Sequence, residues 1–300
     1  MKFRFVPAVL LVSVTLCLAS CASSPAKPEN GLVRIVASTN VYGDIARRIG
    51  GDLVDVVSII GNSARDPHDY SADAHDRLMV SQADIVIMNG GGYDSFLDSM
   101  VSTAHKDVVM LNAVDLSEYN NDTQGNRFNE HVWYDVRTIE RVASTLVSAL
   151  GGRNPSGSAT FDVNGESFAA DLKGLRDSET ALAAVHSGRS VAITEPVPLY
   201  MLEASGLVNA TPATFSDAIE QNTDVPPGIL AQTLDLFAKR SVDALFYNEQ
   251  TGGSQAEAVV AAANANGIPV VPISETLPPG ENYIGWMRKN LGAISGALAG

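Results

Sequence analysis

The sequence predicts an α/β protein made of two parallel-sheet lobes joined by one long rigid helix. Short apolar runs rich in β-branched residues alternate with helical patterns, as in parallel sheets covered by helices on both faces. A helical pattern that is free of proline and poor in glycine spans residues 161–186, more than twice the mean helix length of about 11–12 residues. Because the β/α alternation resumes after this segment, the long helix is expected to connect two lobes.

The first lobe is predicted to contain four strand–helix units. Its strands are short apolar runs, and its helices show apolar residues three or four positions apart. The helix at 42–49 is expected to end at Gly50-Gly51, and the helix at 136–150 at Gly151-Gly152. The predicted strands are 32–38, 53–60, 84–89 and 107–111, and the predicted helices are 42–49, 71–82, 94–101 and 136–150.

The second lobe repeats this alternation with fewer strands. The predicted strands are 190–194, 243–247 and 268–273, and the predicted helices are 198–204, 229–239, 254–265 and 283–298. The expected organisation is an N-terminal lobe at 31–152, a linking helix at 153–187 and a C-terminal lobe at 188–300. Ligands of such sheets bind beyond the carboxyl ends of the strands, so the cleft between the lobes is the expected site.

The N-terminal segment has the pattern of an export signal. Lys2 and Arg4 precede an apolar stretch that is too short for a membrane span. Residues 1–20 are therefore predicted to be a signal peptide, and Leu18-Ala19-Ser20-Cys21 resembles a bacterial lipobox with Cys21 as the lipidated residue. Residues 21–30 are small, polar and proline-containing, as expected of a lipidated tether.

Composition excludes several classes of protein. The hydrophobic content of 45% argues against disorder. The formal charge of −14 disfavours nucleic-acid binding, and loss of the two signal-peptide cations makes it −16. The chain has 2 cysteines, Cys17 in the predicted signal and Cys21, and 5 histidines. A transition-metal site in the exported protein must therefore combine histidines with carboxylates.

Two histidines lie in connections where ligands are expected. His68 follows the strand at 53–60, in a loop stiffened by Pro67, and His131 precedes the helix at 136–150. The other three histidines have ordinary explanations. His75 is expected on a solvated helix face, His105 in a surface turn, and His186 in the last turn of the long helix, where a cation suits the dipole.

Three acidic residues follow predicted strands of the second lobe. Glu195 follows the strand at 190–194, and Glu275 comes shortly after the strand at 268–273. Glu249 has a similar position and competes with Glu275. Many acids at such positions are helix caps or exposed loop residues, and the distances along the chain match no local metal motif. These residues alone predict an exported bilobal protein with a cleft, and they do not by themselves predict a metal.

Four segments carry a resemblance to a known family. The sequence resembles the metal-binding solute-binding lipoproteins of bacterial ABC importers, the zinc and manganese type, over essentially the whole exported chain. The segments are Asp66-Pro67-His68-Asp69-Tyr70, His131-Val132-Trp133-Tyr134-Asp135, Thr194-Glu195-Pro196-Val197-Pro198-Leu199-Tyr200 and Ser274-Glu275-Thr276-Leu277.

The resemblance implies one divalent ion, Zn²⁺ or Mn²⁺, held between the lobes. It assigns the ligands to His68, His131, Glu195 and Glu275, with Glu249 as the alternative fourth ligand. Many zinc members have a third histidine and a His-rich loop before the second ligand, and this sequence has neither. Two imidazoles with two carboxylates form a harder site, which suits Mn²⁺, although Zn²⁺ binds more tightly at equal supply.

The implied function is capture of a divalent transition-metal ion and its delivery to an ABC permease, without enzymatic activity. The implied location is the extracytoplasmic face of the cell membrane, through the lipid anchor, and the protein is expected to be a monomer. Two alternatives are an exported metallohydrolase, with an open metal position for water, and a surface adhesin. Asp69 and Asp135 are the expected acceptors that orient the two imidazoles.

Overall fold

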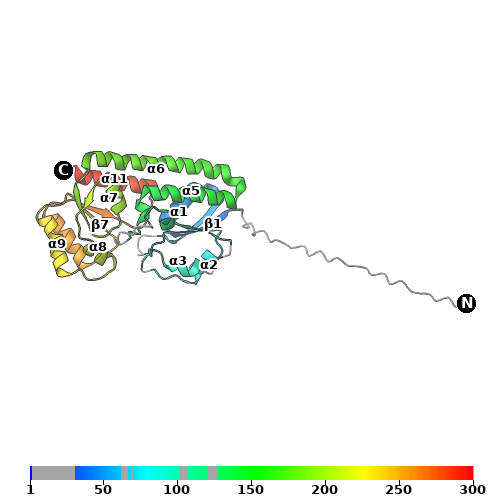
Figure 1. Ribbon diagram of the computed structural model, residues 1–300, viewed down its shortest axis with the longest axis horizontal. Helices are drawn as coiled ribbons and strands as arrows, with labels where there is room; N and C mark the ends of the chain where they lie inside the picture. Colours follow the sequence, from blue (N-terminus) through cyan, green and yellow to red (C-terminus); the bar gives the residue numbers. More distant parts are fainter. Residues whose placement is uncertain are drawn as a thin grey trace.

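The structure is a computed structural model (Figure 1). It describes residues 1, 31–61, 67–68, 70–101, 104, 107–119 and 128–299. The predicted signal peptide, the lipidation site Cys21 and the tether lie outside the described residues, as do Asp66, Asp69 and His105. None of the helices among the described residues is long and apolar enough to cross a membrane.

The first sheet has four parallel strands in the order β2-β1-β3-β4. They are β1 (Val33–Thr39), β2 (Val54–Ile60), β3 (Ile85–Met88) and β4 (Val109–Asn112). Alternate residues of a strand point to opposite faces, so Ile35 and Ile87 join one apolar core while Val36 and Val86 join another. Both faces of this sheet are therefore buried, as the continuous apolar runs predict.

Five α-helices are found among the described residues of this half of the chain. They are α1 (Asn40–Gly50), α2 (Ala74–Ser81), α3 (Phe96–Val101), α4 (Ala113–Leu116) and α5 (Val136–Arg153). α2 starts three residues later than predicted because Asp73 and Asp76 form a capping box there. The prediction that Gly151-Gly152 ends the next helix is wrong, since α5 continues through both glycines and ends before Pro155.

The second sheet also has four parallel strands, in the order β6-β5-β7-β8. They are β5 (Ser190–Ile193), β6 (Val208–Asn209), β7 (Leu245–Asn248) and β8 (Val270–Ile273). The accompanying helices are α7 (Leu199–Ala204), α8 (Ala213–Glu220), α9 (Pro227–Ala238), α10 (Ser254–Ala265) and α11 (Tyr283–Leu298). Sequence analysis missed β6 and α4, which have only two and four residues, and α8, which begins after Pro212 without a side-chain cap.

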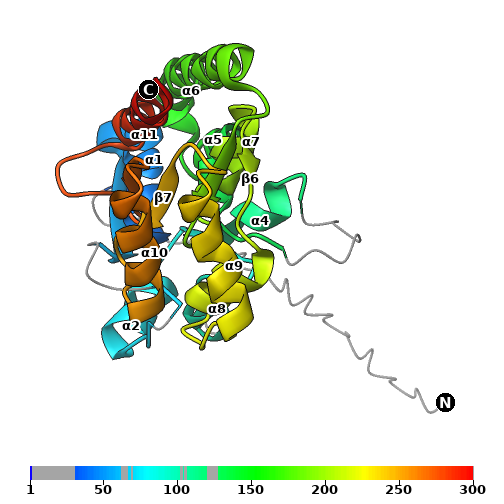
Figure 2. The same cartoon turned by 90° about the vertical axis from the view of Figure 1, so that its left-hand side faces the viewer.

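The long helix is α6 (Ser158–His186), with 29 residues. Its buried face is set by Phe161, Phe168, Leu172 and Leu175, whose spacing follows the helical period. It contacts α1 and α5 on one side and α7 and α11 on the other, and Figures 1 and 2 show α6 and α11 together along the same edge of the molecule. The predicted fold class, two parallel-sheet α/β lobes with one long helix, is confirmed.

A second connection joins the two halves where the chain returns from β8 to α11. The Tyr283 N–H donates to Asp44 Oδ2 at 2.8 Å, and the Tyr283 hydroxyl donates to the Trp133 carbonyl at 2.8 Å. Asn40 and the backbone of Leu277 exchange two hydrogen bonds, at 2.8 and 3.0 Å. With α6 on one side and these contacts on another, the two sheets have little freedom to move apart.

Candidate metal centre

The loop before α5 holds His131 in one orientation. The Asn129 carboxamide oxygen accepts from the His131 backbone N–H at 3.2 Å and lies 2.7 Å from His131 Nδ1, while Asn129 Nδ2 donates to the Pro196 carbonyl at 3.0 Å. Because the oxygen side of Asn129 therefore faces the ring, Nδ1 carries the proton and Nε2 keeps its lone pair. Nε2 is fully buried, makes no hydrogen bond and is available to a ligand.

The surroundings keep His131 neutral. Burial, and the nearby ring of His68, lower the pKa of His131 well below its ordinary value. The Trp133 ring lies 5.0 Å from it between centroids, and the Tyr93 ring 5.9 Å. A neutral imidazole in an aromatic pocket is the form that binds a metal ion, because no proton has to leave first.

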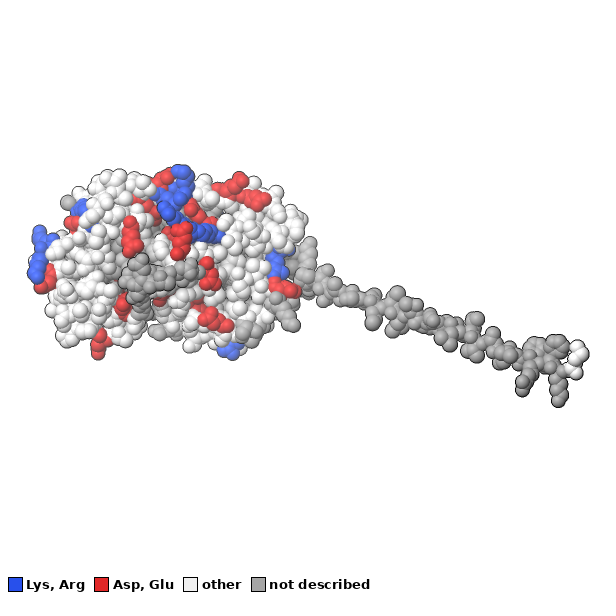
Figure 3. All heavy atoms as spheres, in the orientation of Figure 1, with Lys and Arg blue, Asp and Glu red and all other residues white. Residues whose placement is uncertain are grey.

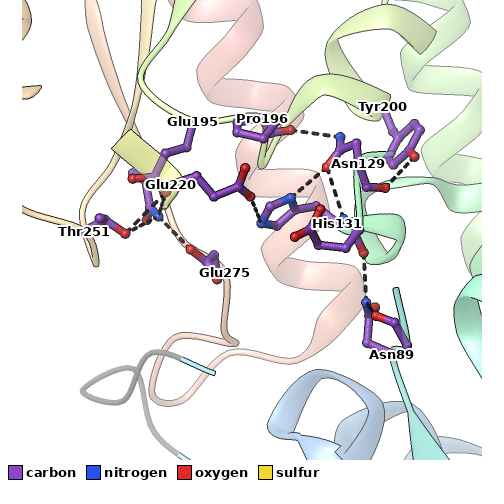
Figure 4. Close-up of polar contacts among 12 residues, drawn as sticks. Asn89, Asn129, His131, Glu195, Pro196, Tyr200, Glu220, Thr251 and Glu275 are labelled. Atoms are coloured by element: carbon purple, nitrogen blue, oxygen red, sulfur yellow. Dashed lines mark hydrogen bonds and ion pairs between the residues drawn. The ribbon is translucent and has the colours of Figure 1, made fainter. Parts of the chain in front are cut away.

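A buried amide fixes the backbone next to His131. Asn89, directly after β3, donates from Nδ2 to the Glu130 carbonyl at 2.9 Å and accepts from the Tyr42 hydroxyl at 2.5 Å. The Asp94 carboxylate in turn accepts from the Asn89 N–H at 2.6 Å. The carboxyl end of β3 thus supports the His131 loop (Figure 4), as expected for a ligand site on a parallel sheet.

His68 approaches the same point from the loop after β2. Its ring centroid lies 5.0 Å from that of Tyr93 and 6.3 Å from that of His131. The two histidines that the sequence singled out are therefore neighbours, although 62 residues separate them along the chain. The shared contact with Tyr93 places both rings on one aromatic side chain.

The carboxylates come from the ends of β5 and β8, and one amide lies between them. Asn248, the last residue of β7, donates from Nδ2 to Glu195 Oε2 at 2.5 Å and to Glu275 Oε1 at 2.8 Å. All three side chains are almost fully buried. The two protons of one carboxamide thus match two carboxylates, which lie side by side at the carboxyl edge of the second sheet.

The donor atoms of the two lobes converge. One donor atom each from His68, His131 and Glu275 lies within 4.8 Å of the others, and Glu195 joins this set through Asn248. A metal ion binds such donors at about 2.0–2.2 Å, so its ligands lie at most about 4.4 Å apart. The three donor atoms therefore have to approach one another by no more than a few tenths of an ångström to share one divalent transition-metal ion. Glu249, the alternative ligand, is exposed and belongs to no such set among the described residues.

Hydrogen bonds between the lobes tie these segments together. The Tyr134 hydroxyl donates to the carbonyl of Ser274, next to Glu275, at 2.8 Å. The Asn129–Pro196 bond does the same next to Glu195, and the Tyr200 hydroxyl donates to the Asn129 carbonyl at 2.7 Å. The relative position of the histidine and carboxylate halves is therefore set by direct contacts as well as by α6.

Sequence analysis missed several residues of this centre. The prediction that Asp135 orients an imidazole is wrong, because its carboxylate caps α5 by accepting from the Thr138 N–H at 2.9 Å and hydroxyl at 2.6 Å; Asn129 has the orienting contact instead. Asn248 was also missed, as was Glu220, whose Oε1 lies 3.6 Å from His131 Nε2. The only available signal was that Asn248 ends a strand, whereas Glu220 lies on the unpredicted helix α8.

Comparisons with known proteins agree with this geometry. The sequence model of the family described as zinc-uptake complex component A, periplasmic, matches residues 35–297. The manganese-binding lipoprotein MntA of Halalkalibacterium halodurans is 24% identical over 305 aligned residues, covering 97% of each sequence. The iron ABC transporter substrate-binding lipoprotein MtsA of Streptococcus pyogenes is 22% identical, covering 94% of each.

Solved structures share the fold. The periplasmic zinc-binding protein TroA of Treponema pallidum matches with a TM-score of 0.73 and 19% identity, over 90% of this chain and 100% of TroA. The Mn²⁺ complex of FpvC from Pseudomonas aeruginosa matches with a TM-score of 0.71 and 21% identity, over 89% and 98% of the two chains.

These matches confirm the resemblance found in the four sequence segments. They also favour the predicted class, a binding protein of an importer rather than an enzyme. Because the family model covers nearly the whole described chain after residue 31, this protein belongs to the family of the periplasmic zinc-uptake complex component A.

Proposed function

We propose that this protein captures one divalent transition-metal ion outside the cytoplasm and delivers it to the permease of an ABC importer. The observation that carries the proposal is the convergence of His68, His131 and Glu275 between the two sheets, with donor atoms within 4.8 Å. Relatives named as manganese-binding and iron-transporter lipoproteins support the same role.

The proposed ligands are His68 and His131 from the N-terminal lobe and Glu195 and Glu275 from the C-terminal lobe. Glu275 is preferred to Glu249 because it is buried and faces the histidines, whereas Glu249 is exposed. The imidazoles supply borderline nitrogen donors, and the carboxylates compensate the charge of the ion. Burial of these groups slows exchange of the bound ion with water.

The donor set accepts both Zn²⁺ and Mn²⁺. Carboxylate oxygens suit Mn²⁺, imidazole nitrogens suit both ions, and intrinsic affinity at equal supply favours Zn²⁺. Selection in the cell then depends on metal supply and on the coordination number that the site allows.

Metal analysis tests the proposal directly. The protein is purified without chelator, its metal content is measured by inductively coupled plasma mass spectrometry, and the stripped protein is titrated with Zn²⁺ and Mn²⁺ in competition. The expected result is one ion per chain, bound with much lower affinity by Glu195→Gln and Glu275→Gln than by Glu249→Gln. Absence of binding of either ion by the wild-type protein contradicts the proposal.

We further infer a lipid anchor at Cys21, after removal of residues 1–20, with residues 21–30 as a tether at the outer face of the cytoplasmic membrane. The names of the relatives as lipoproteins support this location. Radiolabelled palmitate should label the wild-type protein but not Cys21→Ala, and equal labelling of both excludes the anchor.

The expected organisation remains an N-terminal lobe at 31–152, a linking helix at 153–187 and a C-terminal lobe at 188–300, and it is supported by the strands of each sheet, which fall within one lobe. A monomer that docks on the permease is the expected functional unit. Nucleic acid is not an expected partner, because the chain is acidic and the largest group of basic side chains on the face drawn in Figure 3 is small and bordered by acidic ones.

A further inference from the structure

Glu220 is the last residue of α8, and its backbone is held firmly. The Asn222 N–H donates to the Ile219 carbonyl at 3.0 Å, and the Thr223 N–H donates to the Ala218 carbonyl at 2.9 Å. Asn222 has a φ of 52°. This pair of bonds with a left-handed residue is a Schellman motif, and the burial of Phe215 and Ile219 fixes the helix on the second sheet.

The Glu220 side chain points to the proposed metal centre. Its Oε1 lies 3.6 Å from Nε2 of His131, with the Glu220 side chain only 5% exposed. Figure 4 shows the carboxylate directed at the His131 ring, on the same side as Glu195 and Glu275. Nε2 is fully buried and makes no hydrogen bond. Its lone pair therefore faces Glu220 and is available to a metal ion.

A second donor set contains Glu220 and shares a histidine with the first. One donor atom each from His68, Glu130 and Glu220 lies within 4.8 Å of the others. The two sets therefore share His68, the first with Glu275 and the second with Glu220. Because Glu220 also lies next to His131, an ion held by the two histidines is within reach of both carboxylates.

An acidic cavity leads to Glu220 from the surface. It has a volume of about 430 Å³ and is lined in part by Glu203, Asp217 and Glu220. Among the described residues that line it, none is Lys or Arg. Such a cavity attracts cations, because acidic walls of low polarisability focus the field.

The surroundings of Glu220 favour a cation. A carboxylate at the C-terminal end of a helix faces the negative pole of the helix dipole, and the last turn of α8 contains no basic residue. Other carboxylates, those of Glu130 and Glu275, lie around the same histidines. A bound divalent ion removes both sources of repulsion at once.

We propose that Glu220 is a further carboxylate ligand of the captured ion, added to the four proposed ligands on the side of the acidic cavity. This inference rests on the proposed metal-binding function. A fifth, oxygen ligand expands the site beyond the four-coordinate geometry typical of zinc and favours Mn²⁺. Glu220 thus affects the choice between the two ions as well as the affinity.

The test compares Glu220→Gln with Asp217→Asn in the full chain. Both substitutions remove one negative charge from the same helix and the same cavity, but Asp217 belongs to neither donor set. The metal-stripped proteins are titrated calorimetrically with Mn²⁺ and with Zn²⁺ at two salt concentrations. Glu220→Gln is expected to lose at least about tenfold in Mn²⁺ affinity, since even an outer-shell partner contributes 10–100-fold, and less in Zn²⁺ affinity. Asp217→Asn is expected to lose at most about threefold, an effect that salt screens.

Metal-free stability separates a ligand from a structural residue. Glu220→Gln is expected to unfold at the same temperature as the wild-type protein or higher, because a repelled carboxylate is gone. A clear decrease of the unfolding temperature assigns Glu220 a structural role and overturns the inference. An equal, salt-screened loss of Mn²⁺ affinity in Glu220→Gln and Asp217→Asn overturns it as well. If the wild-type protein itself binds neither ion, the proposed function fails. If the wild-type protein binds the ion and Glu220→Gln binds it equally well, only the inference about Glu220 fails.

Discussion

The two halves of the candidate centre are built on opposite principles. The N-terminal half presents the imidazoles of His68 and His131 in an aromatic pocket with Tyr93 and Trp133, and Asn129 fixes the ring of His131 by accepting a hydrogen bond from Nδ1. The C-terminal half presents carboxylates, and Asn248 holds Glu195 and Glu275 together by donating to both. The same residue type, asparagine, acts as an acceptor in one half and as a donor in the other.

The two halves therefore contribute different properties to the site: the histidine half orients the ligand atoms, and the carboxylate half supplies the negative charge. The neutral ring of His131 costs little to bury in its aromatic pocket, so it is held in place without the ion. Adjacent buried carboxylates repel one another and depend on donors or a cation to remain charged. We therefore expect the histidine half to set the geometry of binding, and the carboxylate half to couple binding to the stability of the protein.

The largest effect should follow from removing a preformed imidazole. His131→Ala is expected to lower metal affinity by more than about 100-fold, since loss of an outer-shell partner alone costs 10–100-fold. Calorimetric titration with Zn²⁺ and Mn²⁺ measures this loss. His75→Ala is the matched control, because His75 is exposed on α2 and its loss should leave affinity unchanged. Near-native affinity of His131→Ala contradicts the proposed role of the histidine half.

Substitution of the two asparagines tests the contrast itself. Asn129→Leu removes the acceptor that fixes the tautomer of His131, so metal affinity should fall about 10–100-fold. Asn248→Leu leaves two carboxylates without their shared donor, so the metal-free protein should lose about 1–3 kcal/mol of stability.

Thermal unfolding with and without Zn²⁺ distinguishes the two variants. The ion should stabilise Asn248→Leu by more than it stabilises the wild-type protein, because the cation replaces the missing donor, and Asn129→Leu by less. Equal metal-induced shifts of the unfolding temperature in the two variants contradict the idea that the histidine half sets the geometry of binding and the carboxylate half couples binding to stability.

A smaller, pH-dependent effect concerns the helix that joins the halves. Glu179 occupies the buried face of α6, and burial, together with the charge of Asp135, raises its pKa from 4.5 to about 8. Between about pH 4.5 and 8 the folded protein keeps a proton that the unfolded chain releases. The free energy of unfolding should therefore fall as pH rises through this range, by at most about 1.4 kcal/mol per pH unit.

Urea denaturation of the metal-free protein at pH 5 and pH 8 measures this contribution. Glu179→Gln keeps the neutral form at both pH values, so it should be more stable than the wild-type protein at pH 8 and close to it at pH 5. Glu166→Gln, exposed on the same helix, should leave the difference between the two pH values unchanged. An identical pH profile for Glu179→Gln and the wild-type protein argues against a protonated Glu179. His131 acts in the opposite direction, because its lowered pKa makes stability rise with pH up to about 6.5.

The sequence by itself determined the β/α alternation, the length of α6 and the position of each candidate ligand relative to a strand end. These features depend on local periodicity, which reflects backbone geometry and the burial of one face. The shortage of cysteine and histidine likewise implied a site that includes carboxylates.

Tertiary structure alone decided how these residues meet. Asn129 contacts Pro196 and Tyr200 from about 70 residues away along the chain, and Asn248 joins two carboxylates from different strands. Glu220 reaches His131 from α8, a helix that sequence analysis did not predict. Such contacts arise from the packing of one lobe against the other. A side chain that acts across that interface does not change the hydrophobic periodicity of its own segment, so the sequence pattern does not predict it.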